Sequence, residues 1–326
     1  MAVRLSELGA LGVLNLEGVQ TRYEDPNEVL DRIAAVGKTE FVPLMQEIYS
    51  QPVQEQLIRK RIQDIKAQGG IAAVSGTPVA AMRFRKAIAE AGADLFFVQA
   101  TVVSTNHIGP EGQDTLDLEE LCQGMGLPVV IGNCVTYEVA LQLMRAGAAG
   151  VMVGIGPGAA CTSRGVLGVG IPQATAVADC AAARADFQKE SGRYVPIVAD
   201  GGIVTGGDIC KCIACGADAV MIGSPIARAD EAPGRGFHWG MATPSPVLPR
   251  GTRINVGSTG SIERILRGPA KLDDGTHNLL GCLKTSMGTL GARTIAEMQT
   301  VEVVVAPSLL TEGKVYQKAQ NLGMGK

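Results

Sequence analysis

The sequence predicts an α/β fold arranged as a parallel (β/α)8 TIM barrel that lacks its first strand at the N-terminus. Short apolar runs alternate with amphipathic helical patterns, as in consecutive βαβ units. One pattern also occurs three times, each time as a helix end, a glycine turn and a buried strand: Ala91–Val98, Ala146–Val153 and Cys215–Ile222. Its irregular spacing suits barrel units with loops of different length and excludes a solenoid.

The predicted strands are short apolar runs, most of which follow a glycine or proline. In chain order they cover residues 12–15, 71–74, 95–98, 128–131, 151–153, 196–199 and 219–222. Seven strands before Ser224 leave an eight-stranded barrel one strand short. In such a barrel the functional residues lie on loops at the carboxyl ends of the strands.

The predicted helices begin at capping residues and end at glycine. Asp25-Pro26 starts the first of them, a second carries Leu57 to Ile65, and Pro78 opens a third. Asp117 and Thr136 cap the next two, and the latter ends at Gly147.

Composition excludes several classes of protein. Lys plus Arg total 29 and Asp plus Glu total 32, so the chain lacks the basic surface of a non-specific nucleic-acid binder. No run approaches the length of about 20 apolar residues needed to span a membrane. Glycine, at 42 of 326 residues, far exceeds its average share of about 7% and suits tight turns and close approach to a ligand. We expect a soluble cytoplasmic protein.

Eight cysteines raise the alternative of a metal site. Cys210, Cys212 and Cys215 resemble a ligand run. Yet Cys212 shares a helical face with Ile209 and Ile213, so we interpret it as a small apolar core residue. Disulfides are not expected in a long chain without a signal peptide.

The densest functional signal is a glycine-rich loop after the strand that ends at Val153. Gly154, Gly156 and Gly158 bend this loop so that it presents Cys161 above the barrel. A solvent-reachable cysteine near amide dipoles is a candidate nucleophile. A packed loop cysteine is the alternative.

Two further glycine turns follow the last two strands. Asp200 precedes Gly201-Gly202, and Gly223-Ser224 follows the strand over 219–222. Both turns lead into helix N-termini, a common phosphate site in these barrels, and Asp200 is placed to bind ribose hydroxyls. A phosphorylated small-molecule ligand is therefore predicted, and a capping role is the alternative for Asp200.

Together these stretches resemble the IMP dehydrogenase/GMP reductase family over residues 132–291, with weaker similarity back to Leu11. The matching stretches are Gly132-Asn133, the Cys161 loop, Gly170–Thr175, Ala199–Ile203, Ala217–Ser224 and Gly240-Met241. The closest likeness is to members without the regulatory CBS pair, since residues 12–71 leave no room for it. We therefore expect a single barrel domain over residues 1–326, with a short flap at about 233–258.

The resemblance implies a role for each matching residue. Cys161 would attack purine C2, and Ser163 keeps the hydroxyl that relatives place two residues after the cysteine. Substrate would contact Asp200, Gly202, Gly223, Ser224, His238 and Met241. The nicotinamide would lie near Asn133 and Gln99, and the carbonyls of Gly156, Gly158 and Cys161 would bind a monovalent cation such as K⁺. The implied reaction is NAD-dependent oxidation of IMP to XMP in a homotetramer.

Departures from the family pattern keep alternatives open. Gln99 stands where relatives have an aspartate, Ala159 replaces a phosphate-binding serine, and His238 replaces a tyrosine. The flap lacks the Arg-Tyr pair that activates water, which leaves Arg250 or Arg253 as the candidate base. A GMP reductase using NADPH, or a non-catalytic nucleotide-binding paralogue, are the alternatives.

The family also begins with a segment that carries the first strand, whereas this chain starts within the following helix. We expect a start further upstream, with a barrel open at one strand as the alternative. The chain expressed alone is expected to be poorly soluble or inactive, because two apolar strands would have exposed edges.

Overall fold

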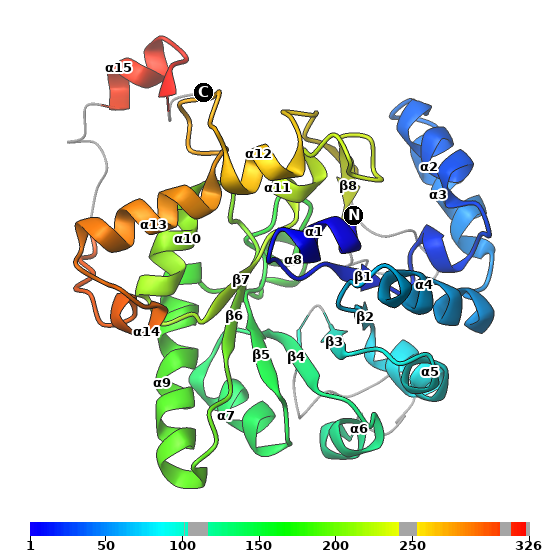
Figure 1. Ribbon diagram of the computed structural model, residues 1–326, viewed down its shortest axis with the longest axis horizontal. Helices are drawn as coiled ribbons and strands as arrows, with labels where there is room; N and C mark the ends of the chain where they lie inside the picture. The colour runs from blue at the N-terminus through cyan, green and yellow to red at the C-terminus, as the bar shows by residue number, and fades with distance from the viewer. Residues whose placement is uncertain (101, 104–116, 241–252, 307–313, 324–326) are drawn as a thin grey trace.

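The structure is a computed structural model that describes residues 1–100, 102–103, 117–240, 253–306 and 314–323. A curled sheet lies at its centre (Figure 1). Seven parallel strands pair in sequence order. They are β1 (Val13–Asn15), β2 (Ala73–Gly76), β3 (Leu95–Gln99), β4 (Val129–Cys134), β5 (Gly150–Val153), β6 (Ile197–Asp200) and β7 (Ala219–Met221).

All seven predicted strands are confirmed, although β2 is shifted by two residues and β4 extends to Cys134. Each strand pairs in parallel with the next, from β1–β2 to β6–β7. In the described part of the chain, β1 and β7 each have a strand on one side. The structure therefore shows the greater part of a parallel barrel, while closure by an eighth strand stays a prediction.

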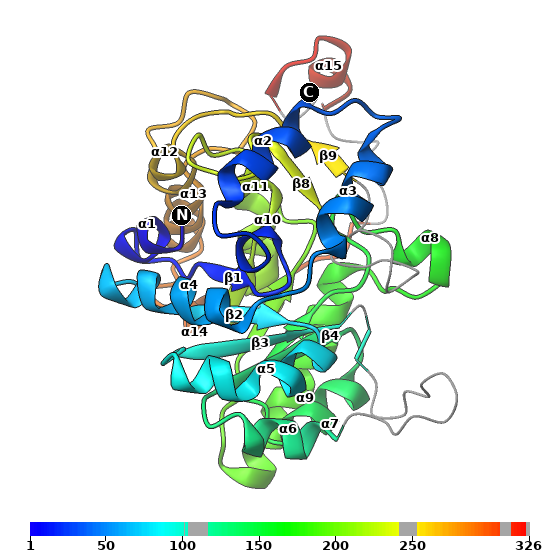
Figure 2. The ribbon, with the colours of Figure 1, turned by 90° about the vertical axis from the view of Figure 1, so that its right-hand side faces the viewer.

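Most of the longer helices cover the outer face of the sheet (Figures 1 and 2). They include α4 (Glu55–Ala67), α5 (Pro78–Glu90), α6 (Leu118–Gly124), α7 (Tyr137–Arg145), α9 (Gln173–Ser191) and α10 (Gly206–Ala214). Successive strand residues face opposite sides. Phe96 packs in the outer core beneath the helices, whereas Phe97 joins a smaller inner cluster with Ala73, Val130 and Met152. Burial on both faces explains the continuous apolar runs of these strands.

Side-chain caps fix several of the helix starts that the sequence predicts. Asp25 accepts from Asn27 N at α2 (Pro26–Ala35), and Asp117 caps α6. Thr136 occupies the N-cap position of α7, as predicted. Its side chain makes no capping hydrogen bond, so the prediction is wrong on that point.

The Cys212 helix is confirmed as a core helix. Ile209, Cys212 and Ile213 are the predicted face and are buried in α10. A capping box between Thr205 and Asp208 fixes its start. Within the described residues, no group of three or more His, Cys, Asp or Glu side chains is arranged to hold a metal ion.

A helical hairpin of α2 and α3 (Phe41–Ser50) forms a separate small cluster on the 3-10 turn η1 (Val19–Thr21). α3 is absent from the sequence predictions, and it contains Pro43. This proline lies in the first turn, where a helix does not use the backbone N–H. Figure 2 shows the hairpin beside an antiparallel ribbon of β8 (Phe237–Trp239) and β9 (Arg253–Asn255), which belongs to the predicted flap.

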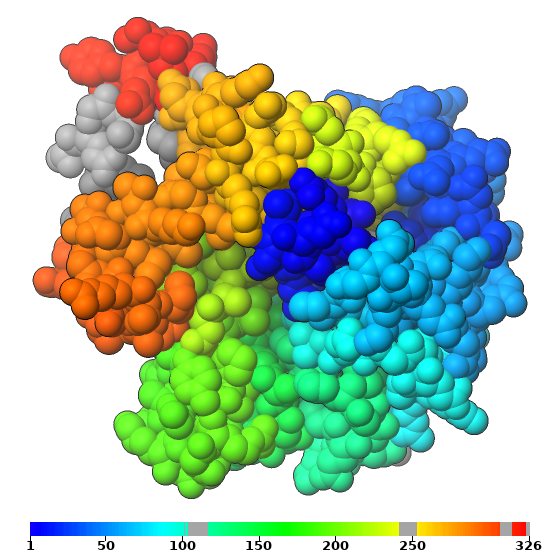
Figure 3. All heavy atoms as spheres, in the orientation of Figure 1, coloured from blue at the N-terminus to red at the C-terminus, as the bar shows by residue number. Residues whose placement is uncertain are grey.

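The remaining described helices are α1 (Ala2–Glu7), α8 (Ser163–Leu167), α11 (Ser224–Ala227), α12 (Ile262–Arg267), α13 (Leu279–Thr289), α14 (Ile295–Met298) and α15 (Lys314–Ala319). Among them, α1 and the α12–α14 region lie on the face shown in Figure 3. None of the helices in the described ranges is long and apolar enough to cross a membrane.

Replacing Cys212 by alanine tests its structural role. The change removes one buried atom from the α10 core, so we expect a loss of about 0.5–1.5 kcal/mol in the free energy of unfolding. Urea denaturation measures this loss. Elemental analysis of the wild-type protein should find no stoichiometric iron or zinc, and finding either metal bound through Cys212 would contradict the core interpretation.

Candidate active site

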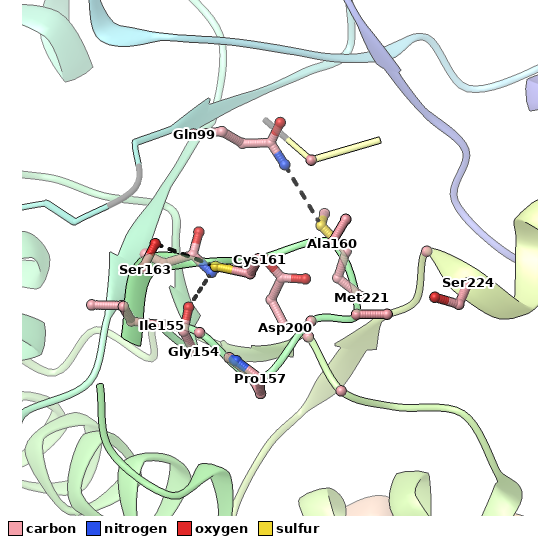
Figure 4. A pocket seen from close by; sticks show the side chains of 18 of the residues that line it. Gln99, Gly154, Ile155, Pro157, Ala160, Cys161, Ser163, Asp200, Met221 and Ser224 are labelled. Carbon is pink, nitrogen blue, oxygen red and sulfur yellow. Dashed lines mark hydrogen bonds between the residues drawn. The ribbon is translucent and has the colours of Figure 1, made fainter. Parts of the chain in front are cut away.

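A pocket of about 590 Å³ opens at the carboxyl ends of the strands. That volume lies within the range of about 300–1,000 Å³ typical of small-molecule sites. Figure 4 shows Gln99, Cys161, Asp200 and Ser224 around this cavity. Apart from Arg253, every predicted site residue in the described part of the chain lines it: Gln99, Asn133, Gly156, Gly158, Cys161, Ser163, Asp200, Gly202, Gly223, Ser224 and His238. Met241 and Arg250 lie outside the described residues.

The Cys161 loop leaves β5 through a glycine that no other residue could replace without strain. Gly154 has φ +145°, and a Cβ atom there would lie 2.0 Å from the carbonyl oxygen of Asp200. The loop therefore passes directly against the end of β6. This close approach brings the cysteine loop and the Asp200 turn into one pocket.

Arg164 holds the same loop in place through two backbone carbonyls. Its Nε donates to the carbonyl of Ile155 at 3.1 Å, and Nη2 donates to that of Ile171 at 2.7 Å. Its aliphatic stem passes so close to Gly156 and Gly170 that a Cβ atom at either position would clash with it. Arg164 is not among the predicted site residues. The available signal in the sequence is the pair Gly156 and Gly170, because both leave room for the Arg164 side chain.

Cys161 points its thiol at a hydroxyl partner. Its Sγ donates to Ser163 Oγ at 3.3 Å, and its backbone N–H donates to the Gly158 carbonyl at 3.0 Å. Ser163 is buried at the start of α8, whereas Cys161 is partly exposed to the pocket. The sulfur is therefore accessible from the pocket and held in place by its neighbours.

Asn133 joins the two ends of the site. Its Nδ2 donates at 2.8 Å to both the Gly154 carbonyl and Asp200 Oδ2. Burial raises the pKa of Asp200 above its ordinary value, and the hydrogen bond from Asn133 opposes that rise. Both amide protons of Asn133 are thus donated within the protein, to the start of the cysteine loop and to the carboxylate.

Gln173, at the start of α9, ties the same two strands together. Its Nε2 donates to the Val153 carbonyl at 2.7 Å and to that of Asp200 at 3.3 Å. Gln173 belongs to the stretch Gly170–Thr175 that resembles the family, but no role is predicted for it. A glutamine that reaches back to the preceding strand end leaves no local sequence signal.

Ser224 and His238 meet at another side of the pocket. Ser224 Oγ lies 3.1 Å from His238 Nε2, although α11 and β8 supply them separately. Burial lowers the pKa of His238, so the imidazole is neutral near pH 7. A Cβ atom at Gly223 would meet no atom within 4 Å, which leaves its backbone open to a ligand. The structure thus brings Gly223, Ser224 and His238 together at one pocket.

Gln99, at the end of β3, points across the pocket. Its Nε2 lies 3.8 Å from the Met221 sulfur, a weak contact that a stronger acceptor could replace. Met221 also lines the pocket, although no site role is predicted for it from the sequence.

Arg253, which the sequence analysis considered as a base, has a different place. Its guanidinium donates to the carbonyls of Ile33 and Val36, and it stacks between the rings of Phe41 and Phe237 at 4.6 and 4.5 Å. The group is bound to the α2–α3 hairpin and does not line the pocket. The suggestion that Arg253 acts as the base is therefore wrong.

Comparison with known proteins agrees with this arrangement. The IMP dehydrogenase / GMP reductase domain model matches residues 1–243. The chain belongs to this family. Its resemblance, inferred above from the loop motifs, is thereby confirmed, and the family is one of oxidoreductases.

Relatives in this family span most of the chain. An uncharacterized oxidoreductase of Mycolicibacterium smegmatis is 39% identical over 93% of this chain and 83% of its own length. Inosine-5'-monophosphate dehydrogenase of Methanocaldococcus jannaschii is 36% identical over 64% of this chain and 47% of its own. A crystal structure of an IMP dehydrogenase/GMP reductase-like protein from Corynebacterium glutamicum superposes with a TM-score of 0.85 at 36% identity, covering 94% of this chain and 81% of that one.

The raised pKa of Asp200 predicts a pH-dependent stability. At pH values between the ordinary carboxyl pKa of 3.8 and the raised pKa of Asp200, the folded protein keeps a proton on Asp200 that the unfolded chain has released. Stability contributed by this group therefore falls as pH rises through that window. Asp200→Asn abolishes the titration, so its stability relative to wild type should increase with pH. Urea unfolding at a series of pH values measures the difference.

Asn133→Leu is the companion variant. It removes the hydrogen bond that lowers the pKa of Asp200, so the window should extend to higher pH. A pH-independent stability difference between wild type and Asp200→Asn would show that the carboxyl does not titrate abnormally.

Proposed function

We propose that this protein oxidises IMP to XMP with NAD⁺, using Cys161 as the nucleophile. The observation that carries the proposal is the convergence of Cys161, Asp200 and the Ser224–His238 pair on one pocket. A purine ribonucleotide has a partner for each of these groups. Its purine would meet the Cys161 thiol, its ribose diol the Asp200 carboxylate, and its phosphate the Ser224–His238 pair. Membership of the IMP dehydrogenase/GMP reductase family supports the same chemistry.

The thiol would react at purine C2. Sulfur adds to C2 with loss of its proton, and the hydrogen of C2 leaves as a hydride. Water then attacks the same carbon, a C–O bond replaces the C–S bond, and the thiol regains a proton. Overall, IMP, NAD⁺ and water give XMP, NADH and a proton. Ser163 Oγ, 3.3 Å from Sγ, is placed to accept the thiol hydrogen bond before attack.

The ribose and phosphate would fix the purine over the sulfur. Asp200 would accept hydrogen bonds from the ribose hydroxyls. Gly202 and Gly223 would offer backbone amides to the phosphate, and Ser224 and His238 would donate from their side chains. Met241 would hold the purine through its backbone. Holding the base in one pose makes attack on C2 effectively unimolecular.

The nicotinamide fits the Gln99 side of the pocket. NAD⁺ supplies a hydride acceptor when bound. Gln99 offers an amide whose contact with the Met221 sulfur is weak and replaceable. Asn133 would act there chiefly by orienting Asp200, because both of its amide protons are already donated.

A K⁺ ion suits the backbone of the cysteine loop. The carbonyls of Gly156, Gly158 and Cys161 come from one tight turn, and oxygen is the ligand such a cation prefers. The Gly158 carbonyl accepts a hydrogen bond from Cys161 N at 3.0 Å, and a carbonyl oxygen has a second lone pair. Arg250, which lies outside the described residues, is proposed to activate water. We also propose a cytoplasmic homotetramer.

NADPH-dependent reduction of GMP is the second candidate, because the same pocket would bind GMP through its ribose and phosphate. Incubation with IMP and NAD⁺, and separately with GMP and NADPH, distinguishes the two by the direction of the absorbance change of the reduced cofactor. Absence of both reactions would favour a nucleotide-binding protein without catalysis.

Cys161→Ala tests the covalent step. Turnover should fall by about 10⁴-fold or more, whereas IMP should still bind, because the phosphate and ribose contacts lie elsewhere. Cys215→Ala, at the far end of α10 and away from the pocket, is the matched control and should retain activity. Activity retained in Cys161→Ala would rule out the covalent mechanism.

The phosphate site is tested by comparing IMP with inosine. Calorimetry should show IMP binding about 100-fold or more tightly, since several charge-assisted hydrogen bonds depend on the phosphate. Ser224→Ala should weaken IMP about 3- to 10-fold and leave inosine unchanged. Equal affinities for IMP and inosine in the wild-type protein would mean that these glycine turns hold no phosphate.

A further inference from the structure

The β8–β9 ribbon presents its two faces to different parts of the molecule. His238 lies between Phe237 and Trp239, and neighbouring side chains of a strand point to opposite faces. His238 reaches Ser224 at the pocket, whereas Trp239 packs against the small cluster of the α2–α3 hairpin. The ribbon thus carries the pocket imidazole on one face and the hairpin contacts on the other.

Arg253 is the first anchor between ribbon and hairpin. It donates to the carbonyls of Ile33 and Val36, the latter at 2.8 Å, at the C-terminal end of α2, where a positive charge is favourable. Its guanidinium also lies between Phe41 of the hairpin and Phe237 of the ribbon. A single side chain therefore joins both helices of the hairpin to both strands of the ribbon.

Trp239 and Tyr49 form the second anchor. The indole Nε1 donates to Tyr49 Oη at 3.1 Å. Arg22 holds the tyrosine in turn, because its guanidinium lies 5.0 Å from the ring centroid and donates to the Tyr49 carbonyl at 3.1 Å. Arg22 therefore holds in position the Tyr49 side chain, whose hydroxyl accepts the hydrogen bond from the Trp239 indole.

A cavity of about 320 Å³ lies between hairpin and ribbon and shares Gly223, His238 and Trp239 with the main pocket. Packing alone therefore does not fix the ribbon on this side. Besides the two anchors, Arg235, just before β8, forms a salt bridge with Asp31 of α2 at 2.8 Å. No described residue of α2 or α3 lines the main pocket itself. The ribbon carries His238 into that pocket, and it is the route by which we expect the hairpin to act.

We propose that the α2–α3 hairpin positions the phosphate-binding end of the site, with Tyr49 and Arg253 acting as positioning residues through His238. This inference rests on the proposed function where it assigns phosphate to His238 and Ser224. The hairpin then sets how tightly a phosphorylated ligand is held. Chemistry at Cys161 depends on it less, because the thiol is carried by the sheet and by its own loop.

Tyr49→Phe removes the acceptor for the indole while keeping the ring, and Arg253→Lys removes the planar fork. Each should weaken IMP about 3- to 10-fold by calorimetry and leave inosine unchanged. KM for IMP should rise by a similar factor, with a smaller change in kcat. In the double variant Tyr49→Phe/His238→Ala, binding should be no weaker than in His238→Ala alone.

Tyr23→Phe is the matched control. Tyr23 belongs to the same cluster and donates to the Ile48 carbonyl at 3.0 Å, within the hairpin region and away from the ribbon. Its loss should lower thermal stability to a similar extent without changing the affinity for IMP. An equal loss of IMP affinity in Tyr23→Phe would mean that hairpin stability alone is responsible, and the proposal would be wrong.

A second readout needs no ligand. The chain has three histidines, so imidazole ¹⁵N spectra can be assigned by substitution. Tyr49→Phe and Arg253→Lys should shift the His238 signals, and Tyr23→Phe should not. Unchanged His238 signals overturn the positioning role whatever the protein binds. Shifted signals in a protein that binds neither IMP nor inosine would support positioning and reject the proposed function.

Discussion

The site depends on one amide that joins three strand ends. Asn133 lies near the carboxyl end of β4 and donates to the Gly154 carbonyl, where the cysteine loop leaves β5, and to Asp200, at the end of β6. Parallel strands bring their carboxyl ends to one edge of the barrel. The amide converts that general proximity into a fixed relation between thiol loop and carboxylate, and Gln173 repeats the connection from the start of α9.

This arrangement has a thermodynamic cost. Asp200 is desolvated, which raises its pKa and makes its charged form unfavourable, and the hydrogen bond from Asn133 compensates in part. A carboxylate with few protein partners and a raised pKa retains a strong tendency to accept hydrogen bonds. Ligand hydroxyls would add hydrogen bonds to the one that Asn133 donates, and would so offset part of the cost of desolvating the Asp200 carboxylate.

The elements that were predicted correctly are those determined by interactions between residues close together in the sequence. Strands buried on both faces appear as apolar runs, and the capping residues Asp25 and Asp117 mark helix starts correctly. The Cys161 loop was recognised from its glycines, and Gly154 is indeed required by contact with the Asp200 backbone. What escaped prediction depends on residues far apart in the chain. The Tyr49–Trp239 hydrogen bond and the contacts of Arg253 with the hairpin leave no local pattern, so the sequence leaves Arg253 open as a candidate base beside Arg250.

The pocket therefore consists of two parts with different support. Cys161, Asn133 and Asp200 are held by the sheet, whose strands are paired and covered by helices. His238 is held by a two-stranded ribbon that reaches the body through a few anchors on an appended hairpin. A change in the hairpin can alter one end of the pocket without disturbing the sheet. In such an architecture, ligand affinity at the His238 end and reactivity at the Cys161 thiol can vary separately, because different contacts maintain the two ends.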